Sequence, residues 1–202
     1  MNWLFYDFVK ATAAPGLLIG YRPKVLYEGG EKIRVKTGMM VVANHIGMTD
    51  PMYVMAGLWY RRIRFVCLKS FFEHRVSRFF FTGFRCIPID RDNVGMDTFR
   101  EIVEAMKADQ AVAIFPGGHV EHAGSAIEEF KAGMVLMALQ AKKPIVPVYL
   151  KRRARWYERL RIAVGQPIDI VARYGERPKM SEIEEIARLV REKEEELKAL
   201  TD

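Results

Sequence analysis

Short apolar runs alternate with segments of helical periodicity along almost the whole chain. The apolar runs cover residues 25–28, 33–35, 39–43, 65–68, 86–89, 111–115, 144–150 and 161–164. Helical patterns cover residues 51–60, 97–107, 130–141 and a final stretch that begins at a capping box, Ser181 with Glu184. Strands that alternate with helices predict an α/β fold, in which helices flank a central, mostly parallel or mixed sheet.

The chain has 202 residues, the length of one ordinary domain. We predict an N-terminal helical segment over residues 1–24 and a single α/β domain over residues 25–202. In an α/β sheet, binding sites gather where parallel strands end. The predicted strands of this chain end at polar or turn residues: His45, Lys69, Arg91 and Pro116. These residues are therefore the first candidates for a functional site.

The stretch from Asn44 to Pro51 carries the strongest chemical signal. It reads as the end of a buried strand, a turn, and the start of a helix at Pro51. Residues five apart on a helix point in different directions, so only a loop that turns back brings His45 and Asp50 together. Such a pair supplies a general base and the acid that orients it. The alternative is structural, because Asp50 before Pro51 is also a good helix cap.

Charge and cysteine content narrow the possible partners. Lys and Arg number 32 and Asp and Glu number 25, a net charge of +7, which favours anionic partners. No recognisable RNA-binding motif accompanies the basic residues, so we expect no nucleic acid partner. Cys67 and Cys86 lie in apolar runs without paired spacing and are expected to be core thiols. A zinc site at His119, Glu121 and His122 is a minor alternative; we predict no metal and no cofactor.

The N-terminal segment is rich in aromatic residues. Residues 2–14 read as a helix that ends at Pro15-Gly16, and charges at Asp7 and Lys10 interrupt its apolar character. It is too short and too interrupted to span a bilayer, so we expect an amphipathic helix in the membrane interface. Packing on the protein's own core is the alternative. Residues 71–81, which mix phenylalanine with arginine, suggest a second lipid-facing surface or a core helix with a basic face.

Four sequence blocks, in this order and spacing, resemble the glycerolipid acyltransferase family. Residues 44–50 resemble its His-x4-Asp motif, and residues 83–91 are similar to a second block that ends in an arginine. Residues 115–118 resemble the third block and residues 143–148 the fourth. The resemblance covers about residues 25–165. The third block departs from the family pattern, because Gly117, His119 and Val120 replace its usual glutamate, threonine and arginine.

The resemblance implies an O-acyltransferase that moves a fatty acyl group from acyl-CoA or acyl-ACP to the hydroxyl of a lysophospholipid. The acceptor of first choice is 1-acylglycerol-3-phosphate, whose acylation gives phosphatidic acid. The resemblance also implies a peripheral enzyme on the cytoplasmic face of the cell membrane. His45 and Asp50 are the expected catalytic pair. The expected substrate-binding residues are Asn44, Lys69, Arg91, Pro116, Gly117, Gly118, Glu121 and Lys131.

Arg91 is the first choice for a phosphate contact, since a planar guanidinium matches phosphate oxygens. Backbone N–H groups near Gly117 and Gly118 are candidates for an oxyanion hole. No serine or cysteine follows the pattern of an enzyme nucleophile, so we expect direct transfer without an acyl-enzyme. The altered third block leaves another acceptor open, an ornithine lipid or a neutral glyceride. A thioester hydrolase and a non-catalytic lipid-binding protein remain as alternatives.

Overall fold

The computed structural model describes residues 3–90, 95–116, 125–151 and 158–201, without the side chains of residues 14, 17, 18 and 125–131. The described residues form one 7-stranded sheet in the order β1-β7-β6-β2-β5-β3-β4. Its strands are β1 (Lys24–Tyr27), β2 (Met39–Ala43), β3 (Ile63–Leu68), β4 (Ile87–Ile89), β5 (Ala111–Ile114), β6 (Ile145–Lys151) and β7 (Arg161–Val164). All neighbouring strands are parallel except β6 and β7. The prediction of a mostly parallel or mixed sheet is confirmed.

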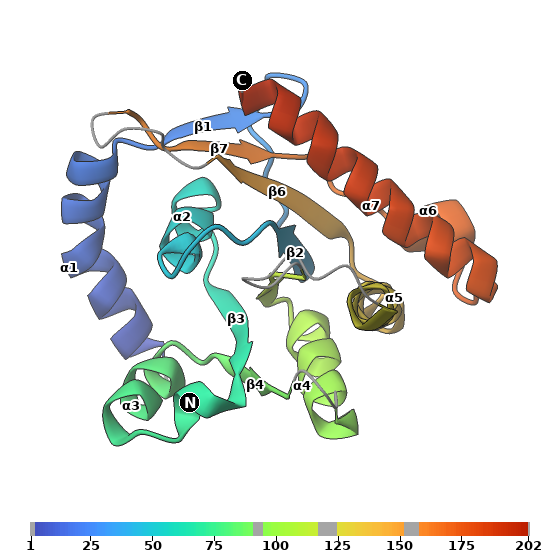
Figure 1. The fold of residues 1–202 in the computed structure, drawn as a ribbon, viewed down its shortest axis with the longest axis horizontal. Helices are drawn as coiled ribbons and strands as arrows, with labels where there is room; N and C mark the ends of the chain where they lie inside the picture. The colour runs from blue at the N-terminus through green and yellow to red at the C-terminus, as the bar shows by residue number, and fades with distance from the viewer. Residues whose placement is uncertain (1–2, 91–94, 117–124, 152–157, 202) are drawn as a thin grey trace.

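Helices cover both faces of the sheet, as Figure 1 shows, with α1, α2 and α3 on one side and α4, α5, α6 and α7 on the other. They are α1 (Leu4–Tyr21), α2 (Asp50–Gly57), α3 (Arg75–Gly83), α4 (Met96–Lys107), α5 (Ser125–Ala141), α6 (Ile170–Tyr174) and α7 (Met180–Thr201), with a 3-10 helix, η1 (Lys69–Phe72). The short helix α6 was not expected from the sequence.

The two cores follow from the two-residue period of the strands. Met40 and Val42 of β2 pack with α4, α5 and α7 in one core. Met39, Val41 and Ala43 of the same strand pack with α2 in the other. Because β2 is central and buried on both faces, every one of its residues is apolar, as parallel strands require.

The helix α1 is docked on the domain by polar as well as apolar contacts. Tyr6 is fully buried, and its hydroxyl accepts a hydrogen bond from the backbone N–H of Ile63 at 3.1 Å. Asp7 forms an ion pair with Arg62. The ammonium group of Lys10 donates to the carbonyl oxygen of Trp59 at 2.5 Å and lies over its ring. The alternative for this segment was packing on the protein's own core. It is confirmed for the face of α1 that turns toward the domain.

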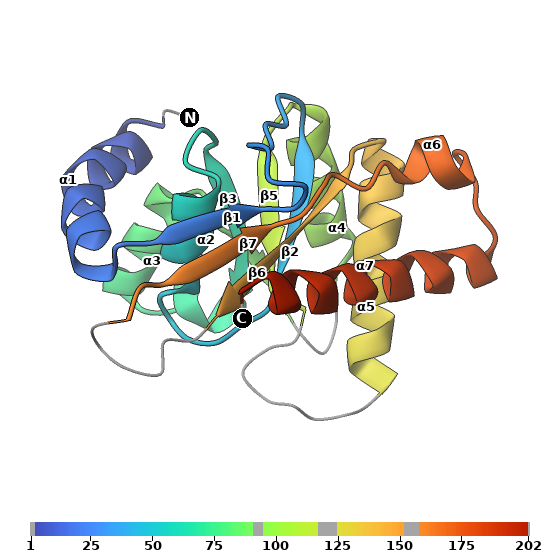
Figure 2. The ribbon, with the colours of Figure 1, turned by 90° about the horizontal axis from the view of Figure 1, so that it is seen from above.

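The predicted end of this helix at Pro15-Gly16 is wrong, because α1 continues to Tyr21 with Pro15 inside it. Its last residue is held from outside the helix. The N–H of Leu160 donates to the carbonyl of Tyr21 at 3.2 Å, and the guanidinium of Arg159 donates to the carbonyl of Arg22 at 3.1 Å. Figure 2 shows α1 running beside the sheet toward the start of β1. The proline therefore did not end the helix, although proline usually does so.

Two further expectations are corrected. Residues 33–35 form no strand; the N–H of Val35 donates to the hydroxyl of Tyr60, and its carbonyl accepts from Arg61, so side chains satisfy this extended backbone. The capping box is also shifted. The helix α7 begins before Ser181, and it is Glu182 whose carboxylate accepts from the N–H of Lys179. Within the described residues, no helix has the length and apolar content to cross a bilayer.

Replacing Tyr6 by Phe should lower the stability of the fold while flattening its alkaline pH dependence. Burial raises the pKa of Tyr6 from 10.0 to about 12. Between these values the unfolded chain ionises first, so the folded form loses stability as pH rises, by roughly 2–3 kcal/mol in all. The variant avoids that loss but leaves the N–H of Ile63 unpaired, which costs about 1–3 kcal/mol at neutral pH.

Urea unfolding at pH 8, 10 and 12 measures both effects of Tyr6→Phe. The control is Tyr174→Phe, whose half-buried side chain on α6 donates from its hydroxyl to the carboxylate of Glu185. Burial and that bond also raise the pKa of Tyr174, so we expect the control to match wild type at pH 8 and to remove a smaller part of the alkaline loss than Tyr6→Phe does. An equal alkaline loss in Tyr6→Phe and wild type would contradict the assigned burial.

Candidate active site

The loop between β2 and α2 begins with a clamp at Asn44. The side-chain amide of Asn44 donates to the carbonyl oxygen of Leu150 at 2.9 Å, and its oxygen accepts from the N–H of the same residue at 2.7 Å. Since Leu150 lies near the end of β6, the neighbour of β2, this pair of bonds fixes where the loop leaves the sheet. Asn44 thus positions the loop, while its expected contact with substrate stays a prediction.

The loop brings the predicted catalytic pair together. His45 Nδ1 and Asp50 Oδ2 are 2.5 Å apart. The same carboxylate oxygen accepts from the N–H groups of Ile46 at 2.6 Å and Gly47 at 2.9 Å. The expectation that the loop turns back before the helix begins is confirmed in geometry, because three donors from the loop converge on one oxygen.

The side chains of His45 and Asp50 lie mostly inside the protein. The side chain of Asp50 is 0% exposed, whereas that of His45 is 21% exposed. Asp50 Oδ1 is also buried, and among the described residues it has no hydrogen-bond partner. With Nδ1 held by the buried carboxylate, Nε2 is the imidazole nitrogen that lies away from Asp50.

The alternative in which Asp50 caps the helix that follows it is wrong. Asp50 is the first residue of α2, and Thr49 stands at the cap without a side-chain hydrogen bond. The carboxylate of Asp50 bonds N–H groups of the preceding loop, not those of the helix. Pro51 does occupy the first turn, where a missing N–H costs nothing.

A stack of aromatic rings lies against the imidazole. The ring centroids of His45 and Phe115 are 4.9 Å apart and the planes differ by 25°. Phe115 in turn stacks on Phe65, with centroids 6.1 Å apart and planes 5° apart. An aromatic ring therefore covers one face of the imidazole, and such burial in apolar surroundings strengthens charge interactions nearby.

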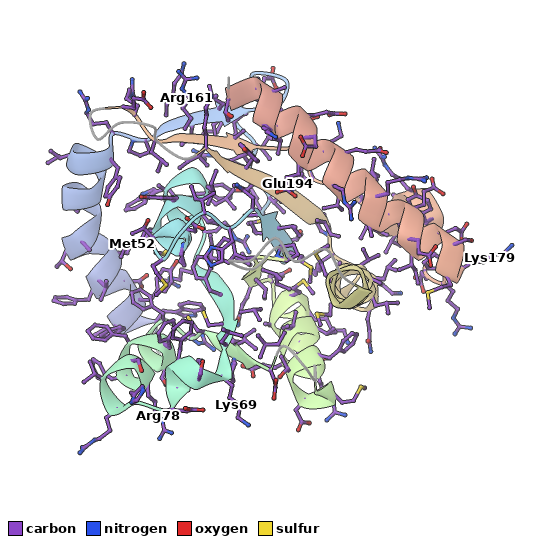
Figure 3. All side chains as sticks on the ribbon, in the orientation of Figure 1. Met52, Lys69, Arg78, Arg161, Lys179 and Glu194 are labelled. Atoms are coloured by element: carbon purple, nitrogen blue, oxygen red, sulfur yellow. The ribbon has the colours of Figure 1, made fainter. Side chains whose placement is uncertain are left out.

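The other predicted site residues divide into described and undescribed ones. Lys69 is exposed at the start of η1, directly after β3. Figure 3 shows it near Arg78 on the side of α3, whereas Arg161 lies at the other end of the sheet. Pro116 is half-buried and directly follows the stacked Phe115. Arg91, Gly117, Gly118, Glu121 and the side chain of Lys131 lie outside the described residues.

The two cysteines are free thiols, as expected. Both are half-buried against the core that lies on the α2 side of the sheet. A hydrogen bond with Cys86 and burial raise the pKa of Cys67, while the same bond, the N–H of Phe65 and the charge of Arg64 lower the pKa of Cys86. Among the described residues no group of acidic, histidine and cysteine side chains has metal-binding geometry. His119, Glu121 and His122 lie outside those residues.

Sequence reasoning missed three parts of the site. The N–H groups of Ile46 and Gly47 carry no sequence signal beyond the turn, because any residue supplies an N–H. Phe115 was visible only as part of the third sequence block. The contact of Phe115 with His45 depends on β5 lying beside β2 in the sheet, which only the structure shows.

The chain is similar in sequence to known acyltransferases. The family model described as Acyltransferase matches residues 24–151. The 1-acyl-sn-glycerol-3-phosphate acyltransferase of Bacillus subtilis (strain 168) is 22% identical over 157 residues, which are 75% of this chain and 77% of that protein. A protein of the same name from Borreliella burgdorferi is 26% identical over 134 residues, 63% of this chain and 51% of that protein.

The fold has a solved counterpart. The crystal structure of the 1-acyl-sn-glycerophosphate (LPA) acyltransferase PlsC from Thermotoga maritima superposes with a TM-score of 0.63 at 18% identity. The match covers 98% of this chain and 92% of that one, which shows a shared fold. The family model spans more than half of the chain and includes His45, Asp50 and all strands from β1 to β6. The resemblance of the four sequence blocks is thus confirmed, and this chain belongs to the acyltransferase family.

Proposed function

We propose that the chain transfers a fatty acyl group from a thioester to the hydroxyl of a lysophospholipid, with 1-acylglycerol-3-phosphate as the acceptor of first choice. The observation that carries the proposal is the buried carboxylate of Asp50 on Nδ1 of a partly exposed His45. Family membership supports acyl transfer, and the names of the two bacterial relatives support this acceptor.

The geometry suits a direct transfer. Nε2 of His45 takes the hydroxyl proton as the acceptor oxygen attacks the thioester carbonyl, because an alcohol is a poor nucleophile without a positioned base. The carbon–sulfur bond then breaks, and the thiol of CoA or of the acyl carrier leaves with that proton. Asp50 holds the ring and stabilises the imidazolium between the two steps. No acyl-enzyme forms, so acid-quenched protein should carry no bound acyl group during turnover.

Because the third sequence block departs from the family pattern, acceptors other than lysophosphatidic acid should also be tested. Purified protein should be given acyl-CoA and acyl-ACP with lysophosphatidic acid, glycerol phosphate, a lyso-ornithine lipid or monoacylglycerol. Formation of phosphatidic acid from lysophosphatidic acid, and its loss in His45→Gln, is the expected result. Product with only the ornithine lipid or the glyceride would replace the acceptor and keep the mechanism. Free fatty acid without acylated product would identify a thioester hydrolase instead.

We also propose that α1 and α3 rest on the cytoplasmic face of an anionic membrane as a peripheral surface. Large apolar side chains are exposed on both helices: Leu4, Phe8, Ile19, Val76, Phe79 and Phe80. The two helices lie side by side (Figure 1), and the ring of Phe5 contacts Phe79 and Phe80. Exposed Arg75 and Arg78 on α3 add the positive charge that anionic headgroups attract.

Flotation with vesicles tests the membrane proposal. Wild type should float with phosphatidylglycerol vesicles and less with neutral phosphatidylcholine. The double variant Phe8→Gln with Phe79→Gln should stay in the dense fraction. The matched control is Met180→Gln, which removes an exposed apolar side chain of 65% exposure from α7, on the other face of the sheet. Equal flotation of the double variant and wild type would contradict the assigned surface.

A further inference from the structure

The imidazole of His45 ends a column of three rings built by three neighbouring strands. His45 follows β2, Phe115 follows β5 and Phe65 lies within β3, and these strands are adjacent in the sheet. Phe65 is only 3% exposed and belongs to the core, so the far end of the column is fixed. Phe115 is the middle ring, between the core and the proposed base.

The strand register explains why the column forms. Phe65 pairs with Ala113 across β3 and β5. Since side chains two apart on a strand share a face, Ala113 and Phe115 point to the same side. The small side chain of Ala113 leaves space beside Phe65, and the ring of Phe115 lies parallel to that of Phe65, 5° apart. Across β2, Val42 pairs with Ile114, which places Phe115 next to the strand that delivers His45.

The bond to Asp50 holds the imidazole at one atom, Nδ1. The backbone on either side of His45 is held as well, by the two bonds of Asn44 to Leu150 and by the bond of the Ile46 N–H to Asp50. A bond at one ring atom leaves rotation about the side-chain torsions to be limited by packing. A flat ring stacked 4.9 Å away restricts the plane of the imidazole.

We propose that Phe115 is a positioning residue, which holds the plane of His45 so that Nε2 faces the acceptor hydroxyl. The inference rests on the proposed acyl transfer and adds a residue to it. The face of Phe115 also stabilises the imidazolium once the hydroxyl proton has moved to Nε2, since aromatic rings attract cations over their faces. The stabilisation by Phe115 is therefore larger in the transition state than in the bound ground state. Its loss should lower kcat and leave KM unchanged.

The test replaces the flat ring by a branched chain of similar hydrophobicity. Phe115→Leu should lower kcat by roughly 3- to 10-fold, the range expected for one aromatic pair, with KM for both substrates within about twofold. Phe115→Tyr keeps the flat face and should recover most of kcat. Phe99→Leu is the control, because Phe99 is partly buried on α4 and packs against the other core. We expect its kcat to equal that of wild type.

A second readout follows the ring geometry itself. In NMR spectra the ring current of Phe115 should shift the Cε1 proton of His45 upfield, a signal assigned by its absence in His45→Gln. Phe115→Leu should return that signal toward its ordinary position and Phe99→Leu should not. If Phe115→Leu lowers the folded fraction, Phe115→Met serves as the second variant, with kcat expressed per folded molecule.

The outcomes separate this inference from the proposed function. Unchanged kcat in Phe115→Leu, in an enzyme that His45→Gln inactivates, would overturn the positioning role and leave acyl transfer intact. A rise in KM alone would reassign Phe115 to substrate binding and equally overturn it. A wild-type protein that acylates no acceptor would overturn the proposed function, and with it the catalytic meaning of the stack.

Discussion

Replacing His45 by Gln should lower kcat/KM for acyl transfer by roughly 10²- to 10⁴-fold, the range that a general base contributes. Glutamine keeps a polar side chain of similar length, but it accepts no proton at neutral pH. The hydroxyl must then lose its proton to water while the bond to the thioester carbon forms. Initial rates with radiolabelled acyl donor at saturating acceptor measure the loss.

The fold should survive this change, because the side chain of His45 is 21% exposed and Asp50 keeps its bonds to the N–H groups of Ile46 and Gly47. Circular dichroism and urea unfolding are the controls. The matched variant is His74→Gln, an exposed histidine at the start of α3 that should keep full activity. If His45→Gln kept the acyl-transfer activity of wild type, His45 would not be the general base. The protein would then have another base or only a lipid-binding role.

Replacing Asp50 by Asn should cost activity by a similar factor, about 10²- to 10³-fold, through the loss of charge. The imidazolium that forms during transfer would face a neutral amide instead of a buried carboxylate. Loss of kcat with little change in KM is therefore expected, because the missing interaction develops as the proton moves. Steady-state kinetics at saturating donor separate the two constants.

The same variant should also destabilise the fold. Oδ2 of Asp50 accepts from the N–H groups of Ile46 and Gly47, so an asparagine oxygen must take that place. The amide NH2 group then falls at the Oδ1 position, which is buried and has no hydrogen-bond partner among the described residues. A buried donor without a partner costs about 1–3 kcal/mol of unfolding free energy.

Asp169→Asn is the matched control for this change. Asp169 caps α6, where its carboxylate accepts from the N–H of Ala172 at 3.0 Å. Asparagine is an equally good cap, so both stability and activity should stay close to wild type. If Asp50→Asn were as active as this control, the carboxylate would be structural and the proposed mechanism would fail.

Local sequence signals predicted most of the sheet. Continuous apolar runs such as residues 39–43 and 111–115 are typical of strands buried on both faces, and both lie within one or two residues of the observed strands. The pairing of His45 with Asp50 was one of two predictions for this stretch, beside a helix cap at Asp50, and it needed a loop that turns back because residues five apart on a helix point in different directions. These features depend on short-range geometry, which residue types determine.

The sequence by itself therefore determined the fold class and the contact between His45 and Asp50. Tertiary structure decided the rest, because those features depend on neighbours far along the chain. The helix α1 continues through Pro15, and Leu160 and Arg159 bond the carbonyl groups at and directly after its end. Residues 33–35 form no strand, and the side chains of Tyr60 and Arg61 bond the backbone of Val35. The ring that stacks on His45 comes from Phe115, brought near by strand order, which no local pattern records.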